Sequence, residues 1–144
     1  MATLSAAGYA GDVTAGDAWK QLQADPKAVL VDVRSEAEWT FVGVPDLSSV
    51  GKRVVQVAWQ KYPGMALNQN FSDDLRKAGV SADQSIYFLC RSGGRSRSAA
   101  QAMTMQGFNR CFNVLGGFEG DLDPARHRGN AGGWKAEGLP WIQS

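Results

Sequence analysis

The chain has 144 residues, of which 44% are hydrophobic and 20% are charged, and its formal net charge is +1. This length and composition predict a single globular domain over residues 1–144. The nearly balanced charge gives no reason to expect nucleic acid or an acidic membrane as a partner, and no apolar stretch is long enough to span a bilayer.

The first third of the chain shows a helix, a strand and a second helix. Thr14 is a suitable N-cap for the first helix. Residues 28–33 form a continuous apolar run broken only by Asp32, as expected for a strand that is covered on both faces. Ser35 and Glu38 then form a capping-box pattern, which predicts the start of a short second helix.

The middle of the chain continues the alternation of strand and helix. The valine-rich stretch Arg53–Trp59 predicts a strand, with loops at 45–51 and 62–70 on either side of it. Ser72 is a suitable N-cap for a helix that Gly79 would end.

The C-terminal half begins with the apolar run Ser85–Cys90, which predicts a buried strand, and the segment 96–106 after it reads as a helix. Cys111–Leu115 predicts a last clear strand, and the tail from Gly116 is rich in glycine and less regular. This alternation predicts an α/β fold with a largely parallel sheet and helices on both of its faces.

A cysteine loop stands at the most informative place in this pattern. Ligands of open α/β sheets bind beyond the carboxyl ends of the strands, and both Cys90 and Arg34 lie at such ends. Residues 90–96 read Cys-Arg-Ser-Gly-Gly-Arg-Ser and run directly into a helix. The N–H groups, the helix N-terminus and the two arginines favour a thiolate at Cys90 together with a second anion. The alternative is that Cys90 is a small buried hydrophobe.

Cysteine usage predicts the compartment. The sequence contains only Cys90 and Cys111, too few for a disulfide scaffold, which fits a reducing environment. The N-terminus lacks a basic start followed by a sustained apolar run, so we expect no signal peptide and a cytoplasmic location. Cys111 is either a resolving thiol for an oxidised Cys90 or a side chain buried on its strand.

The loop Cys90–Arg95 resembles the active-site loop of rhodanese domains, the thiosulfate:cyanide sulfurtransferase family. Further segments resemble that family in the same order, and the likeness spans about Tyr9 to Trp141. These segments are Val29–Arg34 with Glu38-Trp39, Val114–Phe118, Gly133–Lys135 and Gly138–Trp141. The resemblance implies a three-layer sandwich with a sheet of about five strands, and a sulfurtransferase activity that needs no metal and no organic cofactor.

Loop length separates this chemistry from neighbouring ones. Four residues lie between Cys90 and Arg95, whereas the similar loops of cysteine-dependent phosphatases and arsenate reductases carry one residue more. A shorter ring of N–H groups suits a single sulfur atom better than a tetrahedral phosphate. The alternatives are a phosphatase or arsenate reductase, a module that carries a persulfide to a protein partner, and an inactive regulatory domain, against which the retained cysteine and arginines argue.

The expected reaction is covalent catalysis in two half-reactions. A Cys90 thiolate attacks the outer sulfur of thiosulfate, or of a similar small anionic donor, and expels sulfite. A thiophilic acceptor, either cyanide or a thiol, then removes the sulfur from the persulfide, which predicts ping-pong kinetics. A protein is a further candidate acceptor.

Arginines are the expected contacts for the anionic end of the donor, since guanidinium groups pair well with oxyanions. The resemblance favours Arg91, which directly follows the cysteine. Arg95 either binds the donor or pairs with an internal carboxylate and holds the loop. Arg34 is either a second anion contact or part of a structural salt bridge, and Asp32 is expected to order loops through hydrogen bonds.

The remaining loop residues complete the predicted binding site. Ser92 and Ser96 can donate hydroxyl hydrogen bonds to the sulfur, although Ser96 alternatively caps its helix. Gly93 and Gly94 are expected to supply backbone geometry that side chains would block.

Overall fold

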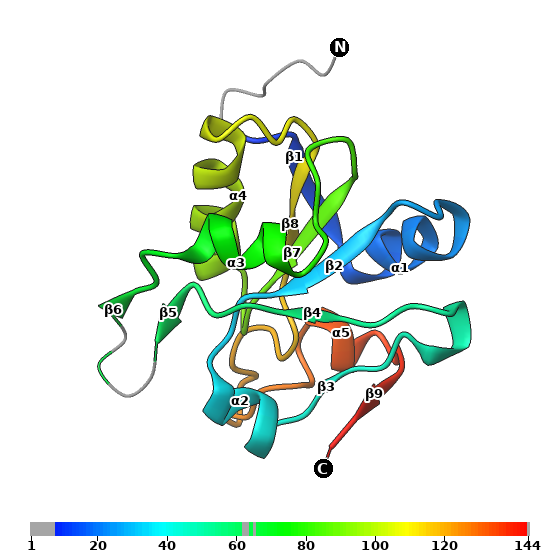
Figure 1. The fold of residues 1–144 in the computed structure, drawn as a ribbon. Helices are drawn as coiled ribbons and strands as arrows, with labels where there is room; N and C mark the ends of the chain where they lie inside the picture. The colour runs from blue at the N-terminus through cyan, green and yellow to red at the C-terminus, as the bar shows by residue number, and fades with distance from the viewer. Residues whose placement is uncertain (1–7, 62–63, 65, 144) are drawn as a thin grey trace.

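The computed structural model describes residues 8–61, 64 and 66–143. Its centre is a five-stranded parallel sheet in the order β1-β8-β7-β2-β4 (Figure 1). The strands are β1 (Gly11–Thr14), β8 (Cys111–Leu115), β7 (Ile86–Leu89), β2 (Val29–Asp32) and β4 (Val55–Gln56). The predicted fold class, a largely parallel sheet of about five strands, is confirmed.

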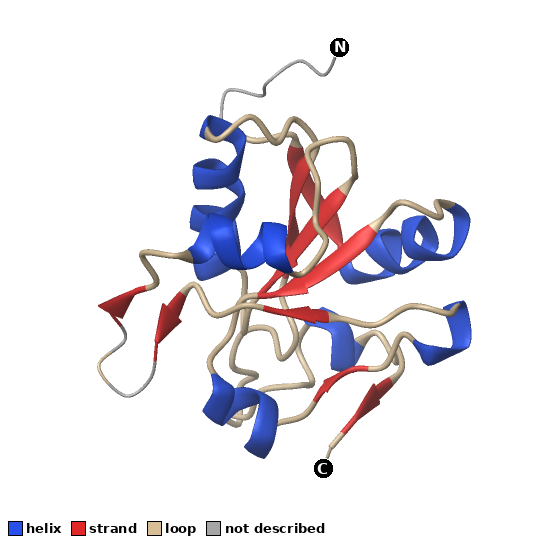
Figure 2. Cartoon of the chain, viewed as in Figure 1, coloured by secondary structure: helices blue, strands red, loops and turns tan. Residues whose placement is uncertain are grey.

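Helices cover both faces of this sheet (Figure 2). One face packs against α1 (Ala15–Ala24) and the short α5 (Gly133–Ala136), and the other packs against α3 (Phe71–Lys77) and α4 (Gly94–Met105). This arrangement gives the three expected layers. Among the described residues, no helix is long and apolar enough to cross a membrane.

Smaller elements surround the sheet. After β2 comes α2 (Glu36–Phe41), followed by a 3₁₀ turn, η1 (Ser48–Val50). Two antiparallel pairs complete the fold. They are β3 (Val44–Pro45) with β9 (Trp141–Ile142), and β5 (Gln60–Lys61) with β6 (Ala66–Leu67).

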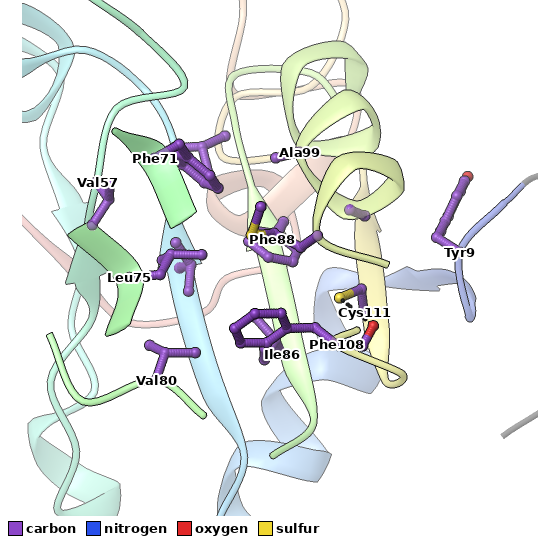
Figure 3. Packing of buried hydrophobic residues seen from close by; sticks show 14 of the residues in the cluster. Tyr9, Val57, Phe71, Leu75, Val80, Ile86, Phe88, Ala99, Phe108 and Cys111 are labelled. Carbon is purple, nitrogen blue, oxygen red and sulfur yellow. Dashed lines mark hydrogen bonds between the residues drawn. The ribbon is translucent and has the colours of Figure 1, made fainter. Parts of the chain in front are cut away.

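The central strand β7 sets the direction of the cysteine that follows it. Side chains of a strand alternate between the two faces of the sheet. Ile86 and Phe88 therefore join the core beneath α3 and α4 (Figure 3). Tyr87 and Leu89 join the core beneath α1. Cys90 continues the first series and lies on the α4 side of the sheet.

Two predicted helix starts are confirmed at the level of single hydrogen bonds, and a third is wrong. The Thr14 hydroxyl accepts a hydrogen bond from the N–H of Asp17, and Ser35 forms both halves of a capping box with Glu38. The third helix begins at Phe71 and not after Ser72, because Phe71 is buried against the core and its N–H donates to the carbonyl of Asn68.

Most of the other differences between the predicted and the observed elements concern the edge strands of the sheet. The predicted strand 53–59 is regular only at Val55–Gln56, where it pairs with β2 on one side. The strand β1 at the opposite edge is half exposed, and its sequence Gly-Asp-Val-Thr lacks the apolar run that marks a buried strand. The helix α5 and the strand β9 lie in the glycine-rich tail, and of the loop predicted at 62–70, residues 62, 63 and 65 lie outside the described residues.

The loop after β8 is joined to the cysteine loop by backbone hydrogen bonds. The N–H of Phe118 donates to the carbonyl of Cys90 at 2.8 Å, and the N–H of Glu119 donates to the carbonyl of Arg91 at 3.0 Å. Gly117 has a φ of +56°, and a Cβ at this position would overlap the carbonyl oxygen of Cys90. Only glycine allows this approach of the two backbones.

Replacing Gly117 with Ala should therefore destabilise the protein more than replacing Gly51 with Ala. Both glycines have positive φ, +56° and +71°, but a Cβ at Gly51 would have nothing within 4 Å. The backbone conformation costs about 1–2 kcal/mol at either position, and the overlap at Gly117 adds about 1–3 kcal/mol. Urea denaturation of the two variants measures the difference, and equal losses would show that the cysteine loop yields to the added methyl group.

Candidate active site

The thiol of Cys90 lies at the carboxyl end of β7 inside a small cavity. Its side chain is 1% exposed, and its sulfur accepts a hydrogen bond from the N–H of Gly93 at 3.1 Å. Gly93 has a φ of +119°, a conformation that other residues rarely adopt. The cavity has a volume of about 190 Å³. Its lining residues are Cys90, Arg91, Ser92, Gly94 and Arg95.

The helix α4 begins directly after this turn, with Gly93 as its N-cap and no side-chain cap. Its first N–H groups carry partial positive charge on the side of the cysteine loop, which favours an anion there. Ser96 stands in the first turn of α4, so it is not the N-cap. The Ser96 hydroxyl is fully buried, and its oxygen lies 3.2 Å from the sulfur of Cys90.

Arg95 is engaged in an ion pair. Its two terminal nitrogens donate to the two carboxylate oxygens of Glu38, at 2.6 and 3.0 Å. Burial alone would raise the pKa of Glu38, but the hydrogen bonds from Arg95 and from the backbone of Ser35 outweigh it and lower the pKa to about 2. The guanidinium is thus held by an internal carboxylate, and a contact between Arg95 and a substrate stays a prediction.

Arg34 lies deeper than the loop. It is fully buried, and its Nε and Nη2 donate to the two carboxylate oxygens of Asp32 at 2.8 and 2.5 Å. The guanidinium also stacks over the ring of Phe118 at 4.3 Å and donates to the carbonyl of Gly43. Within the described part of the chain, its Nη1 has no hydrogen-bond partner, and Arg34 does not line the cavity at Cys90.

Arg91 is exposed and joins the small cavity to a wider one of about 480 Å³. The wider cavity is lined by Glu38, Val42, Gln60, Arg91, Arg95, Glu119 and Arg128. Arg128 was not predicted at the site, because it lies in the glycine-rich, less regular tail, where the sequence carries no motif that points to the cysteine loop. In the structure this part of the tail lies against the wider cavity, and Nη1 of Arg128 donates to the carbonyl of Gly120 at 2.6 Å.

Two other features, a second cavity and Cys111, do not offer an alternative nucleophilic site. A cavity of about 520 Å³ lies against Trp39, Asn68 and Lys77, but none of the described residues that line it is a cysteine, serine or histidine. Cys111 is fully buried, and burial raises its pKa to about 11, so its thiol keeps its proton at neutral pH. The described residues include no group of three or more His, Cys, Asp and Glu placed to hold a metal ion.

Replacing Glu38 with Gln should remove a pH-dependent part of the stability. The pKa of Glu38 falls from its ordinary 4.5 to about 2 on folding. Its charge therefore stabilises the folded state above about pH 4.5, and this contribution is lost as the pH falls through about 2. A shift of this size corresponds to roughly 3 kcal/mol. The difference in unfolding free energy between the wild type and Glu38→Gln should be constant near neutral pH and shrink in acid.

Glu36→Gln is the matched control, since Glu36 is exposed in the same first turn of α2. Its difference from the wild type should change little over that pH range. Urea denaturation at a series of pH values measures both, and a difference for Glu38→Gln that does not vary with pH would contradict the assigned role of the ion pair.

Comparison with known proteins places this chain in a family. The family model described as the STR4 middle domain matches residues 10–144. The crystal structure of Rv0390 from M. tuberculosis is similar over 94% of this chain and 99% of its own, with a TM-score of 0.86 and 52% identity. The rhodanese-like domain-containing protein 4 of Arabidopsis thaliana chloroplasts is 27% identical over 137 residues, which cover 92% of this chain and 26% of that protein.

A third relative carries an activity in its name. The thiosulfate sulfurtransferase GlpE of Glaesserella parasuis is 28% identical over 109 residues, which cover 76% of this chain and 83% of the relative. The chain belongs to the rhodanese-like family, a family of the sulfurtransferase type.

Proposed function

We propose that the protein is a sulfurtransferase that takes a sulfane sulfur from thiosulfate, or a similar donor, and holds it on Cys90 as a persulfide. The observation that carries this proposal is a buried thiol, facing the N–H of Gly93, in a cavity rimmed by arginines. The likeness to a named thiosulfate sulfurtransferase supports the choice of donor.

The first half-reaction loads the cysteine. The Sγ thiolate attacks the outer sulfur of thiosulfate, a bond forms between these two sulfurs, and the bond from the outer sulfur to the sulfonate sulfur breaks. Its electron pair leaves with sulfite, and the negative charge of the enzyme moves to the new terminal sulfur. The N–H of Gly93 and the start of α4 stabilise anionic sulfur in this cavity.

The second half-reaction unloads the cysteine. A nucleophile such as cyanide or a thiolate attacks the terminal sulfur, and the electron pair of the sulfur–sulfur bond returns to Sγ. The chemistry is a transfer between two nucleophiles, so the residues of the chain suffice and the kinetics should be ping-pong. The wider cavity beside Arg91 gives an acceptor room to approach, and a protein thiol is a further candidate.

The shape of the small cavity favours sulfur over phosphate chemistry. Its volume of about 190 Å³ lies within a loop of only four residues between Cys90 and Arg95. Arg95 is also turned to Glu38, whereas a bound phosphate would need its guanidinium. Both cysteines are unpaired thiols, which suits the reducing cytoplasm in which we place the reaction.

Thiosulfate should make the wild-type protein heavier by one sulfur atom, and cyanide should remove that atom. Cys90→Ser should show neither change, because the attacking sulfur is absent. Cys111→Ser is the matched control and should be labelled like the wild type, since its thiol is buried and protonated at neutral pH. Intact-protein mass spectrometry measures all three, and labelling that depends on Cys111 would identify the wrong thiol.

Replacing Arg91 with Gln should lower kcat/KM for thiosulfate by about 10- to 100-fold, the range expected for losing a hydrogen bond to a charged group. The exposed side chain of Arg91 makes no ion pair with another described residue, so the stability should be unchanged. Arg126→Gln, on an exposed loop, is the control and should keep wild-type kinetics. Steady-state rates over a range of thiosulfate concentrations decide, and wild-type kinetics in Arg91→Gln would place the sulfonate contact elsewhere.

A further inference from the structure

A line of polar side chains runs from the sulfur of Cys90 to the edge of the sheet. Ser96 on α4 lies 3.2 Å from the sulfur and 2.6 Å from Oδ1 of Asn113 on β8. Nδ2 of Asn113 donates to Oδ1 of Asp12 on β1 at 3.0 Å, and the hydroxyl of Tyr9 donates to the same oxygen at 2.6 Å. Ser96 and Asn113 are fully buried.

The exposed end of this line determines which way the amide of Asn113 points. An ionised carboxylate only accepts hydrogen bonds, so Asp12 must face the NH₂ group of Asn113 and not its oxygen. Burial and the hydrogen bond to Asp12 raise the pKa of Tyr9, so its hydroxyl keeps its proton and stays a donor to the same carboxylate. With Nδ2 turned to Asp12, the amide oxygen is left facing Ser96.

The buried end has one proton for two acceptors. The hydroxyl of Ser96 lies within hydrogen-bond distance of both the amide oxygen of Asn113 and the sulfur of Cys90, but it carries a single hydrogen. The distances of 3.2 Å to sulfur and 2.6 Å to oxygen do not rank the two contacts, because sulfur is the larger atom, but the sulfur also accepts the N–H of Gly93 at 3.1 Å. The amide oxygen of Asn113 is fully buried, and among the described side chains the Ser96 hydroxyl is its one hydrogen-bond donor. This balance of donors and acceptors favours the bond with Asn113.

We propose that Asn113, oriented by Asp12, is a positioning residue that turns the hydroxyl of Ser96 so that its oxygen, and not its proton, faces the sulfur of Cys90. A lone pair directed at Sγ disfavours negative charge on that atom. In the free enzyme the charge of the thiolate is on Sγ, whereas in the persulfide it is on the outer sulfur. The arrangement therefore favours the loaded state over the unloaded one, a consequence that rests on the proposed sulfurtransferase function.

The test leaves unchanged the other charged residues near Cys90 and near Asp12. Arg95 and Arg91 line the cavity that holds Cys90. Arg97 on α4 contacts the hydroxyl of Tyr9 near Asp12. None of these residues is substituted, so a change at the sulfur reports on the line through Ser96.

Asn113→Leu is the main variant, because leucine has a similar size and cannot accept the proton of Ser96. The hydroxyl is then free to donate to the Cys90 thiolate. We expect the equilibrium constant for loading by thiosulfate, measured as the loaded fraction by mass spectrometry at fixed ratios of sulfite to thiosulfate, to fall about tenfold. Alkylation of Cys90 by iodoacetamide in mild acid should become about three- to tenfold faster, since more thiolate outweighs its lower nucleophilicity.

Asp12→Ala is the second variant. Because Asp12 is exposed, this substitution does not alter the packing of a buried side chain. Without the carboxylate, the amide of Asn113 can turn its NH₂ group to Ser96, and both readouts should move in the same direction. Asp73→Asn, which removes an exposed carboxylate on α3, is the matched control and should change neither readout.

Each variant is repeated with Ser96→Ala, which removes the hydroxyl. The effects of Asn113→Leu and Asp12→Ala should then disappear, and effects that persist without the hydroxyl would overturn the proposal, as would wild-type readouts in both variants. Failure of the wild type to gain sulfur from thiosulfate would reject the proposed function instead. The alkylation rates would still decide the orientation of Ser96.

Discussion

The bidentate ion pair between Arg95 and Glu38 is the interaction on which the geometry of the site depends. The strands β2 and β7 are parallel neighbours, with Asp32 level with Leu89, so the segments after them leave the sheet side by side. The ion pair joins these segments. Glu38 also closes the capping box of α2, so one carboxylate fixes both a helix start and the base of the cysteine loop.

The strand on the other side of β7 holds the loop by backbone contact. After β8 the chain turns at Gly117, and its next N–H groups donate to the carbonyls of Cys90 and Arg91. The loop is thus fixed on one side by charge and on the other by close backbone packing. Because neither contact uses the sulfur, Sγ is left to the N–H of Gly93 and the hydroxyl of Ser96.

The features that could be predicted are those that depend on residues close together in the sequence. The central strand β7 is an unbroken apolar run, and the capping box of Ser35 and Glu38 has a fixed spacing, so both are visible in the sequence. The pairing of Glu38 with Arg95 joins residues 57 positions apart and has no local signal. Asn113 gives still less warning, since a polar residue within an apolar strand does not say which side chain it meets.

Burial distinguishes Arg95, whose role the sequence left open, from Arg91, which the family resemblance favours as the contact for the donor. The side chain of Arg95 is 18% exposed and held by Glu38, whereas Arg91 is exposed at the mouth of both cavities. A guanidinium that is already held contributes a fixed positive potential and little adaptability, which suits the building of a loop. A free guanidinium can close on an incoming anion and release the departing one. The two transfers of the proposed reaction would require that exchange, which is why we propose Arg91 as the arginine that meets the donor.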